Sequence, residues 1–169
     1  MIAQLLVLIA LPALLAVAAG WDLASFTIPN FLQLALLGGF LLFVAAAGLS
    51  LTAVGWHLLA GCVGLLLGFG FFAAGWIGGG DAKLFAAVAL WLGFHDILPY
   101  ALVASVFGGV LTLALLALRQ RPLPVFLVGQ PWVLRLHDRT AGVPYGVALA
   151  AGAFILLPYT EIFRLAAAG

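Results

Sequence analysis

Long apolar stretches, separated by short polar, glycine-containing or proline-containing breaks, run along most of this chain. A helix that crosses the hydrocarbon core of a bilayer needs about 20 mainly apolar residues. Backbone groups in hydrocarbon must be satisfied within the segment, so we expect each stretch to form a helix. The sequence therefore predicts an all-α bundle of about six transmembrane helices, at residues 2–20, 30–49, 52–74, 81–95, 98–118 and 142–160.

The fourth predicted helix is shorter than the others. Residues 81–95 would span roughly 22 Å at about 1.5 Å per residue, whereas the hydrocarbon core is about 30 Å thick. Either the helix begins below the membrane surface, which places Asp81 inside the bilayer, or the bilayer thins around it. The glycines that precede Asp81 permit non-helical backbone and close helix approach.

The composition agrees with a membrane protein and excludes several other classes. The chain is 67% hydrophobic and 7% charged, with a mean hydropathy of +1.33, as expected for a polytopic membrane protein. Its length indicates a single domain over residues 1–169. A net charge of +1 without a basic tract argues against nucleic-acid binding. With one cysteine, Cys62, the chain cannot form a cysteine-based zinc site, and we expect no metal or cofactor.

The basic residues predict the orientation in the membrane. Residues 2–20 follow no basic region, so we interpret them as a retained helix and not as a cleaved signal. With six helices, the connections 20–30, 74–81 and 119–141 share one face. Five of the six basic residues fall at this face: Lys83, Arg119, Arg121, Arg135 and Arg139. The positive-inside rule makes it cytoplasmic and leaves both termini on the non-cytoplasmic side.

The loop 119–141 mixes apolar residues with scattered arginines. This mixture suits a segment that lies in the membrane interface. The loop either shields the bundle or lines the access path of a substrate helix.

Two of the five acidic residues come together in this topology. Asp22 ends the first predicted helix and Asp81 starts the fourth, at the same face. An acid at membrane depth costs about 2.5 kcal/mol or more and usually has a function. Two neighbouring carboxylates share one proton, because like charges a few ångströms apart do not ionise together easily. Such a pair suits acid/base hydrolysis, in which one member takes a proton from water and the other hydrogen-bonds the scissile carbonyl.

Simpler interpretations stand beside this one. Asp22 alone is also consistent with a solvated acid at a helix end, and Asp81 with a helix cap. Lys83 either anchors its helix at the interface or stabilises the negative charge of Asp81. His57, near the outer end of the third predicted helix, is expected at the interface.

Three motifs, in order along the chain, resemble a known family. Gly78-x-Gly80-Asp81 matches the GxGD signature of intramembrane aspartyl proteases, and the longer run Gly79-Gly80-Asp81-Ala82-Lys83-Leu84 resembles the prepilin peptidases, or type IV leader peptidases. Asp22 is followed after five residues by Ile28-Pro29-Asn30, similar to the stretch that carries the family's first catalytic aspartate. Residues 142–148, Gly-Val-Pro-Tyr-Gly-Val-Ala, are similar to its last helix.

The resemblance implies that Asp22 and Asp81 are the catalytic pair. It also implies site-shaping roles for Gly78, Gly79, Gly80 and Lys83, and substrate-binding roles for Pro29, Asn30, Pro144 and Tyr145. The implied activity is removal of the short leader of pilin-like precursors at the cytoplasmic face of the bacterial inner membrane. Such precursors carry an apolar helix just after the cleavage point.

The resemblance also narrows the branch of the family. Many members insert a cytosolic domain with paired CxxC motifs after the first helix and also N-methylate the new N-terminus. This chain has only the connection 20–30 there and a single cysteine. It resembles the compact, peptidase-only branch associated with tight-adherence (Flp-type) pili, which implies no methyltransferase activity.

Two competing functions come from other classes. A small transporter or channel would use Asp22 and Asp81 as a proton or cation relay. A relay favours acids at several depths or inverted repeats around a midplane site, whereas here both acids lie at one end. A non-catalytic partner in pilus assembly is the other alternative.

Overall fold

The computed structural model describes residues 1–168, and within them it is helical with no strand, which confirms the predicted all-α class. Three short 3-10 segments, at Phe94–Asp96, Val125–Leu127 and Leu157–Tyr159, and one π-helical segment, Leu6–Ala10, join or interrupt the α-helices. The α-helices are α1 (Ile2–Leu5), α2 (Leu11–Ser25), α3 (Asn30–Ala47), α4 (Leu51–Ala73), α5 (Gly79–Leu92), α6 (Ile97–Arg119), α7 (Pro131–His137), α8 (Tyr145–Leu156) and α9 (Glu161–Ala168).

The described residues contain four helices long and apolar enough to cross a membrane: Ile2–Ser25, Asn30–Ala47, Leu51–Ala73 and Phe94–Arg119. A fifth span is present if α8 and α9, which meet at a bend of 54°, count as one. The protein is therefore a multi-pass membrane protein. Of the roughly six expected transmembrane helices, the fourth, α5, is short as expected: it has 14 residues, or about 21 Å of helix, and is not among these spans.

The last predicted helix, 142–160, is also interrupted. Its α-helical part begins at Tyr145 and ends at Leu156. Pro158 follows in the 3-10 segment, and proline has no N–H to donate to the carbonyl four residues before it. The chain bends here and continues as α9, which contacts α1 and α5.

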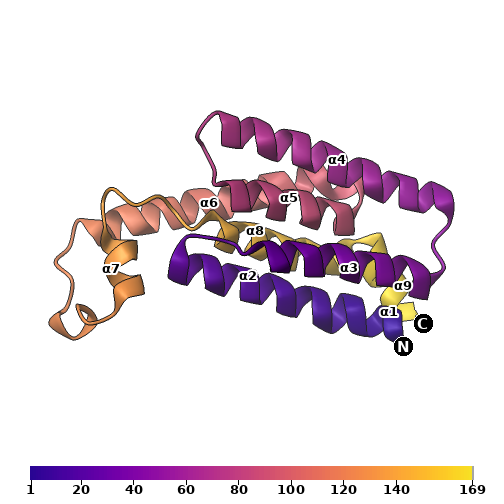
Figure 1. The fold of residues 1–169 in the computed structure, drawn as a ribbon, viewed down its shortest axis with the longest axis horizontal. Helices are drawn as coiled ribbons and strands as arrows, with labels where there is room; N and C mark the ends of the chain where they lie inside the picture. The colour runs from indigo at the N-terminus through magenta and orange to yellow at the C-terminus, as the bar shows by residue number, and fades with distance from the viewer. Residues whose placement is uncertain (169) are drawn as a thin grey trace.

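The short helix α5 lies inside the bundle, in contact with α3, α4, α6, α8 and α9 (Figure 1). Residues 84–92 are all buried. The approach of α4 is very close, because a Cβ at Gly68 would lie 2.9 Å from the carbonyl oxygen of Ala82. Small residues at a helix contact allow such backbone approach in membranes. Neighbouring helices thus cover α5, which does not have to match the thickness of the lipid.

Two hydrogen bonds fix the far end of α5. Trp91 Nε1 donates to the carbonyl oxygen of Leu36 at 2.9 Å, and His57 Nδ1 lies 2.8 Å from the carbonyl oxygen of Leu90. Only 6% of His57 is exposed, so its side chain points into the bundle, and its depth in the membrane stays a prediction. The helix ends at Leu92, three residues before the approximate end that the sequence predicted. Gly93 has a φ of +93°, a conformation that ends the helix and favours glycine.

The two ends of the bundle carry different parts of the chain. Both termini lie at one end, and the α2–α3 connection, the α4–α5 connection and α7 lie at the other (Figure 1). Asp22, near the end of α2, and Asp81, near the start of α5, therefore belong to the same end. That this end faces the cytoplasm stays a prediction.

Candidate active site

Asp22 is held in the last turn of α2 by the way this helix ends. Phe26 follows the helix in a left-handed conformation with φ of 57°, and its N–H donates to the carbonyl oxygen of Asp22 at 2.7 Å. The Ser25 hydroxyl donates to the carbonyl oxygen of Trp21 at 2.7 Å and thereby satisfies another carbonyl of the last turn. The chain then turns back through Ile28 into α3. The Asp22 side chain is left facing the interior, and only 3% of the residue is exposed.

Oδ2 of Asp22 accepts a hydrogen bond of 2.7 Å from the backbone N–H of Gly146, in the first turn of α8. A Cβ at Gly146 would lie 2.9 Å from this oxygen and 2.8 Å from Cδ1 of Ile28. Only glycine fits this position without displacement of its neighbours. The N-terminal end of a helix also carries partial positive charge, which favours a carboxylate.

Asp81 lies in the first turn of α5 and uses one oxygen to cap its own helix. The Gly78 N–H donates to Oδ2 of Asp81 at 3.1 Å, which is one half of a capping box. Oδ1 is buried and has no hydrogen-bond partner within residues 1–168. The capping interpretation is thus confirmed for one oxygen, and the second stays free for another partner.

Both aspartates line one cavity of about 300 Å³, together with Phe26, Thr27, Ile28 and the glycines 78–80. Asp22 contributes to this cavity from the end of α2, and Asp81 from the start of α5. A buried acceptor without a partner is unfavourable unless water or another donor reaches it. The cavity therefore has room for a water molecule beside the two carboxylates.

The three glycines before Asp81 act through their small size. Their φ angles are not positive, and Gly78 is extended at φ −73° and ψ 155°. The expected non-helical backbone is thus present at Gly78, while Gly79 and Gly80 already belong to α5. A Cβ at Gly80 would lie 3.2 Å from Cβ of Ile28, and one at Gly78 would lie 3.0 Å from Oδ2 of Asp81. These glycines let the α2–α3 connection approach Asp81.

Lys83 does not contact Asp81 directly. Its Nζ donates to Oδ1 of Asn30 at 3.0 Å, which links α5 to α3. Gln33 makes a second link, because its Nε2 donates to the carbonyl oxygen of Gly80 at 3.3 Å. The two contacts hold the start of α5 against the start of α3.

The predicted substrate-binding residues lie around the aspartate cavity, but none of them lines it. Pro29 and Pro144 precede the first residues of α3 and α8. Tyr145 packs against Gly108 and lines a separate, mainly apolar cavity of about 300 Å³ with Phe85. Asn30 is exposed and accepts a hydrogen bond from Lys83.

Sequence reasoning missed the part played by Arg119. This buried arginine donates to the carbonyl oxygens of Leu136 at 2.8 Å, Ala141 at 3.0 Å and Gly142 at 2.8 Å. It thereby connects the end of α6 to α7 and to the irregular segment that precedes α8. Gly146 lies in the first turn of α8. Sequence analysis used Arg119 only as a topological signal. Its position at the end of an apolar helix, before a long loop, was the available indication.

The structure gives no clear metal site in the residues it describes. They contain no group of three or more histidine, cysteine, aspartate or glutamate side chains placed to hold a metal ion.

Fold and site together define a multi-pass membrane protein with paired carboxylates at one end of its bundle. The chain belongs to the type IV leader peptidase family, whose sequence profile matches residues 9–113. That match includes both aspartates and ends before residues 142–148. No curated protein and no solved structure matches the chain significantly. Membership makes the protein a membrane protease of the prepilin leader peptidase type, and the family implies pilin precursors as substrates.

Proposed function

We propose that this protein is an aspartic-type endopeptidase in which Asp22 and Asp81 activate water to remove the leader of pilin-like precursors. The proposed substrates are Flp-type precursors, cut at the cytoplasmic face of the bacterial inner membrane. The observation that carries the proposal is the shared cavity, which two buried carboxylates from different helices line and where one oxygen of Asp81 has no hydrogen-bond partner among residues 1–168.

The proposed reaction needs one ionised and one protonated carboxyl group. The ionised group takes a proton from a water molecule, whose oxygen attacks the scissile carbonyl carbon. The protonated group hydrogen-bonds the carbonyl oxygen and then gives a proton to the leaving amine as the C–N bond breaks. Because the two groups interact, their titration belongs to the pair and not to either residue alone. No side-chain nucleophile takes part.

The proposed activity stops at peptide cleavage. The α2–α3 connection contains only residues 26–29, so this chain lacks an inserted domain at that point. We propose that the new N-terminus of the product leaves without methylation. Mass spectrometry of the mature pilin tests this point, and a methylated product made by the purified enzyme would contradict it.

Isosteric substitutions test the two-aspartate mechanism. Asp22→Asn and Asp81→Asn should each abolish leader cleavage of a precursor reconstituted in vesicles, with the folded protein retained in detergent. Asp138→Asn is the matched control, because Asp138 is exposed in the loop and hydrogen bonds from Thr140 lower its pKa. Full cleavage by either of the first two variants would sink the mechanism. Cleavage should also persist with a chelator, and its loss would point to metal chemistry instead.

A further inference from the structure

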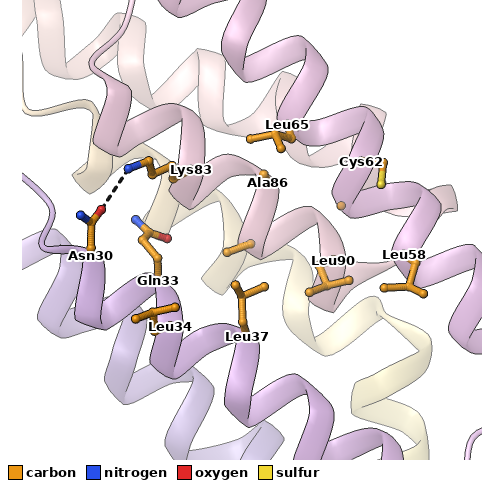
Figure 2. A pocket seen from close by; sticks show the side chains of 12 residues that line it. Asn30, Gln33, Leu34, Leu37, Leu58, Cys62, Leu65, Lys83, Ala86 and Leu90 are labelled. Atoms are coloured by element: carbon orange, nitrogen blue, oxygen red, sulfur yellow. Dashed lines mark hydrogen bonds between the residues drawn. The ribbon is translucent and has the colours of Figure 1, made fainter.

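A lateral groove of about 460 Å³ runs along the outside of α5, between α3 and α4 (Figure 2). Its walls are Leu34 and Leu37 from α3, and Leu58, Cys62 and Leu65 from α4. These wall residues are exposed, so the groove opens sideways. In a membrane this opening faces the hydrocarbon.

The floor of the groove is made mostly of small residues, which suits a helix. Gly61 of α4 and Ala86 and Ala87 of α5 line it, together with the larger Leu90. Small residues let the backbone of a neighbouring helix approach closely in a membrane. A segment of polypeptide in hydrocarbon must itself be helical to satisfy its backbone groups. The shape and lining therefore fit one face of an apolar helix.

One end of the groove is polar and adjoins the aspartate cavity. Asn30, Gln33 and Lys83 line this end. Nε2 of Gln33 donates a hydrogen bond to the carbonyl oxygen of Gly80, the residue before Asp81. Oε1 of Gln33 is buried and has no hydrogen-bond partner in the described part of the chain. Polar side chains of this kind make hydrogen bonds between helices in membranes. The groove thus starts beside the proposed catalytic residues and leads away into the bilayer.

We propose that this groove binds the apolar helix of the membrane-anchored substrate, with the scissile bond at the aspartate cavity. The proposal rests on the proposed function for the identity of the partner. The helix would enter sideways from the bilayer and pack between α3 and α4, on the small residues of α5. The peptide before the helix would cross the polar end of the groove, past Gln33 and Lys83, to reach Asp22 and Asp81.

The only cysteine of the chain allows a direct test. Cys62 lines the groove and is exposed. It lies roughly 9 Å along α4 from Gly68, which contacts Ala82 beside Asp81, at about 1.5 Å per residue. Precursors with single cysteines along the apolar helix are reconstituted with the Asp81→Asn protein in vesicles and oxidised. We expect disulfides with Cys62 about six residues after the scissile bond, with maxima that repeat every three to four residues.

The matched control moves the thiol out of the groove. In the double variant Cys62→Ala, Leu67→Cys the cysteine stays on α4, about 7.5 Å nearer its end at Ala73, at a position that is exposed and outside the groove lining. Periodic crosslinks from Cys62 that disappear in the control support the proposal. Crosslinks that are equal for both positions, or absent from both, would mean that lipid chains fill the groove. This readout does not depend on Asp22 and Asp81 being catalytic.

A second test compares two substrates. Leu37→Trp narrows the groove, and Leu42→Trp adds the same ring at an exposed position of α3 outside it. One substrate is the full precursor, and the other is a soluble peptide with the leader and scissile bond but no apolar helix. Leu37→Trp should lower the ratio of kcat/KM for the precursor to kcat/KM for the peptide several-fold, because KM for the precursor rises. Leu42→Trp should leave this ratio unchanged. An unchanged ratio would overturn the groove proposal, whereas failure of both substrates with the parent protein would overturn the proposed function.

Discussion

The backbone N–H of Gly146 donates a 2.7 Å hydrogen bond to Oδ2 of Asp22, and this contact joins the start of α8 to the end of α2. The two residues are 124 positions apart. The contact fixes the orientation of the Asp22 carboxylate, and it leaves no space for a side chain at position 146. The geometry of the proposed catalytic pair thus depends on a residue from the third motif of the chain.

Gly146→Ala should therefore reduce activity strongly. The added Cβ would lie within 3 Å of Asp22 Oδ2, so either the carboxylate or α8 must shift. A small displacement of a catalytic group can lower the rate by about 100-fold. Leader cleavage by purified enzyme measures the effect. Gly142→Ala is the control, because a Cβ there meets nothing within 4 Å among the described residues. Equal activity of the two variants would contradict the assigned role.

Arg119→Gln should loosen the segment that leads into α8. The substitution leaves at least two of three carbonyl oxygens, one buried and two partly buried, without their donor, and an unsatisfied group that is fully buried costs about 1–3 kcal/mol. We expect a lower melting temperature and protease cleavage between residues 120 and 144, with reduced activity as Gly146 loses its position. The exposed Arg121 provides the control Arg121→Gln. A variant at position 119 with normal protease resistance would argue against the role of Arg119.

The contact between α4 and α5 gives a test of how α5 is held. Gly68→Ala places a Cβ about 3 Å from the backbone of Ala82, one residue after Asp81. Overpacking of this kind typically costs about 1–3 kcal/mol, and the displaced α5 should also lower activity. Gly70→Ala, on the same helix, adds a methyl group where nothing described lies within 4 Å. Thermal unfolding in detergent should separate the two variants, and similar melting temperatures would show that α5 tolerates the shift.

The sequence predicted the helical class, the common end of Asp22 and Asp81, and the short α5 because these follow from local patterns. Apolar run length marks a helix, and the run after Asp81 is visibly short. The position of α5 inside the bundle was not predictable in this way. The position of α5 depends on Gly64 and Gly68 of α4, which pack against residues 82–89 of α5. When a helix is apolar on all sides, its sequence does not show which of its faces packs against which neighbouring helix.

The long-range contacts at the site were hidden for the same reason. Three residues form hydrogen bonds with residues distant in the chain: His57, Gln33 and Gly146. No local spacing in the sequence indicates the partners of these hydrogen bonds. His57 was expected at the membrane interface because it lies near the outer end of its helix. A carbonyl of α5 satisfies it in the interior instead, as buried polar groups require.

Asp81 has two separable roles, and substitutions should distinguish them. Its Oδ2 caps α5 through Gly78, while the unpartnered Oδ1 is available to water or substrate. Asp81→Asn keeps an acceptor for the cap and should lose activity with little change in stability. Asp81→Ala should lose activity and also about 1 kcal/mol of stability, because it removes the acceptor of the cap hydrogen bond. Thermal unfolding and leader cleavage, measured on both variants, test this separation. Equal destabilisation of both would mean that the charge itself stabilises α5, and residual cleavage by Asp81→Ala would remove Asp81 from the reaction.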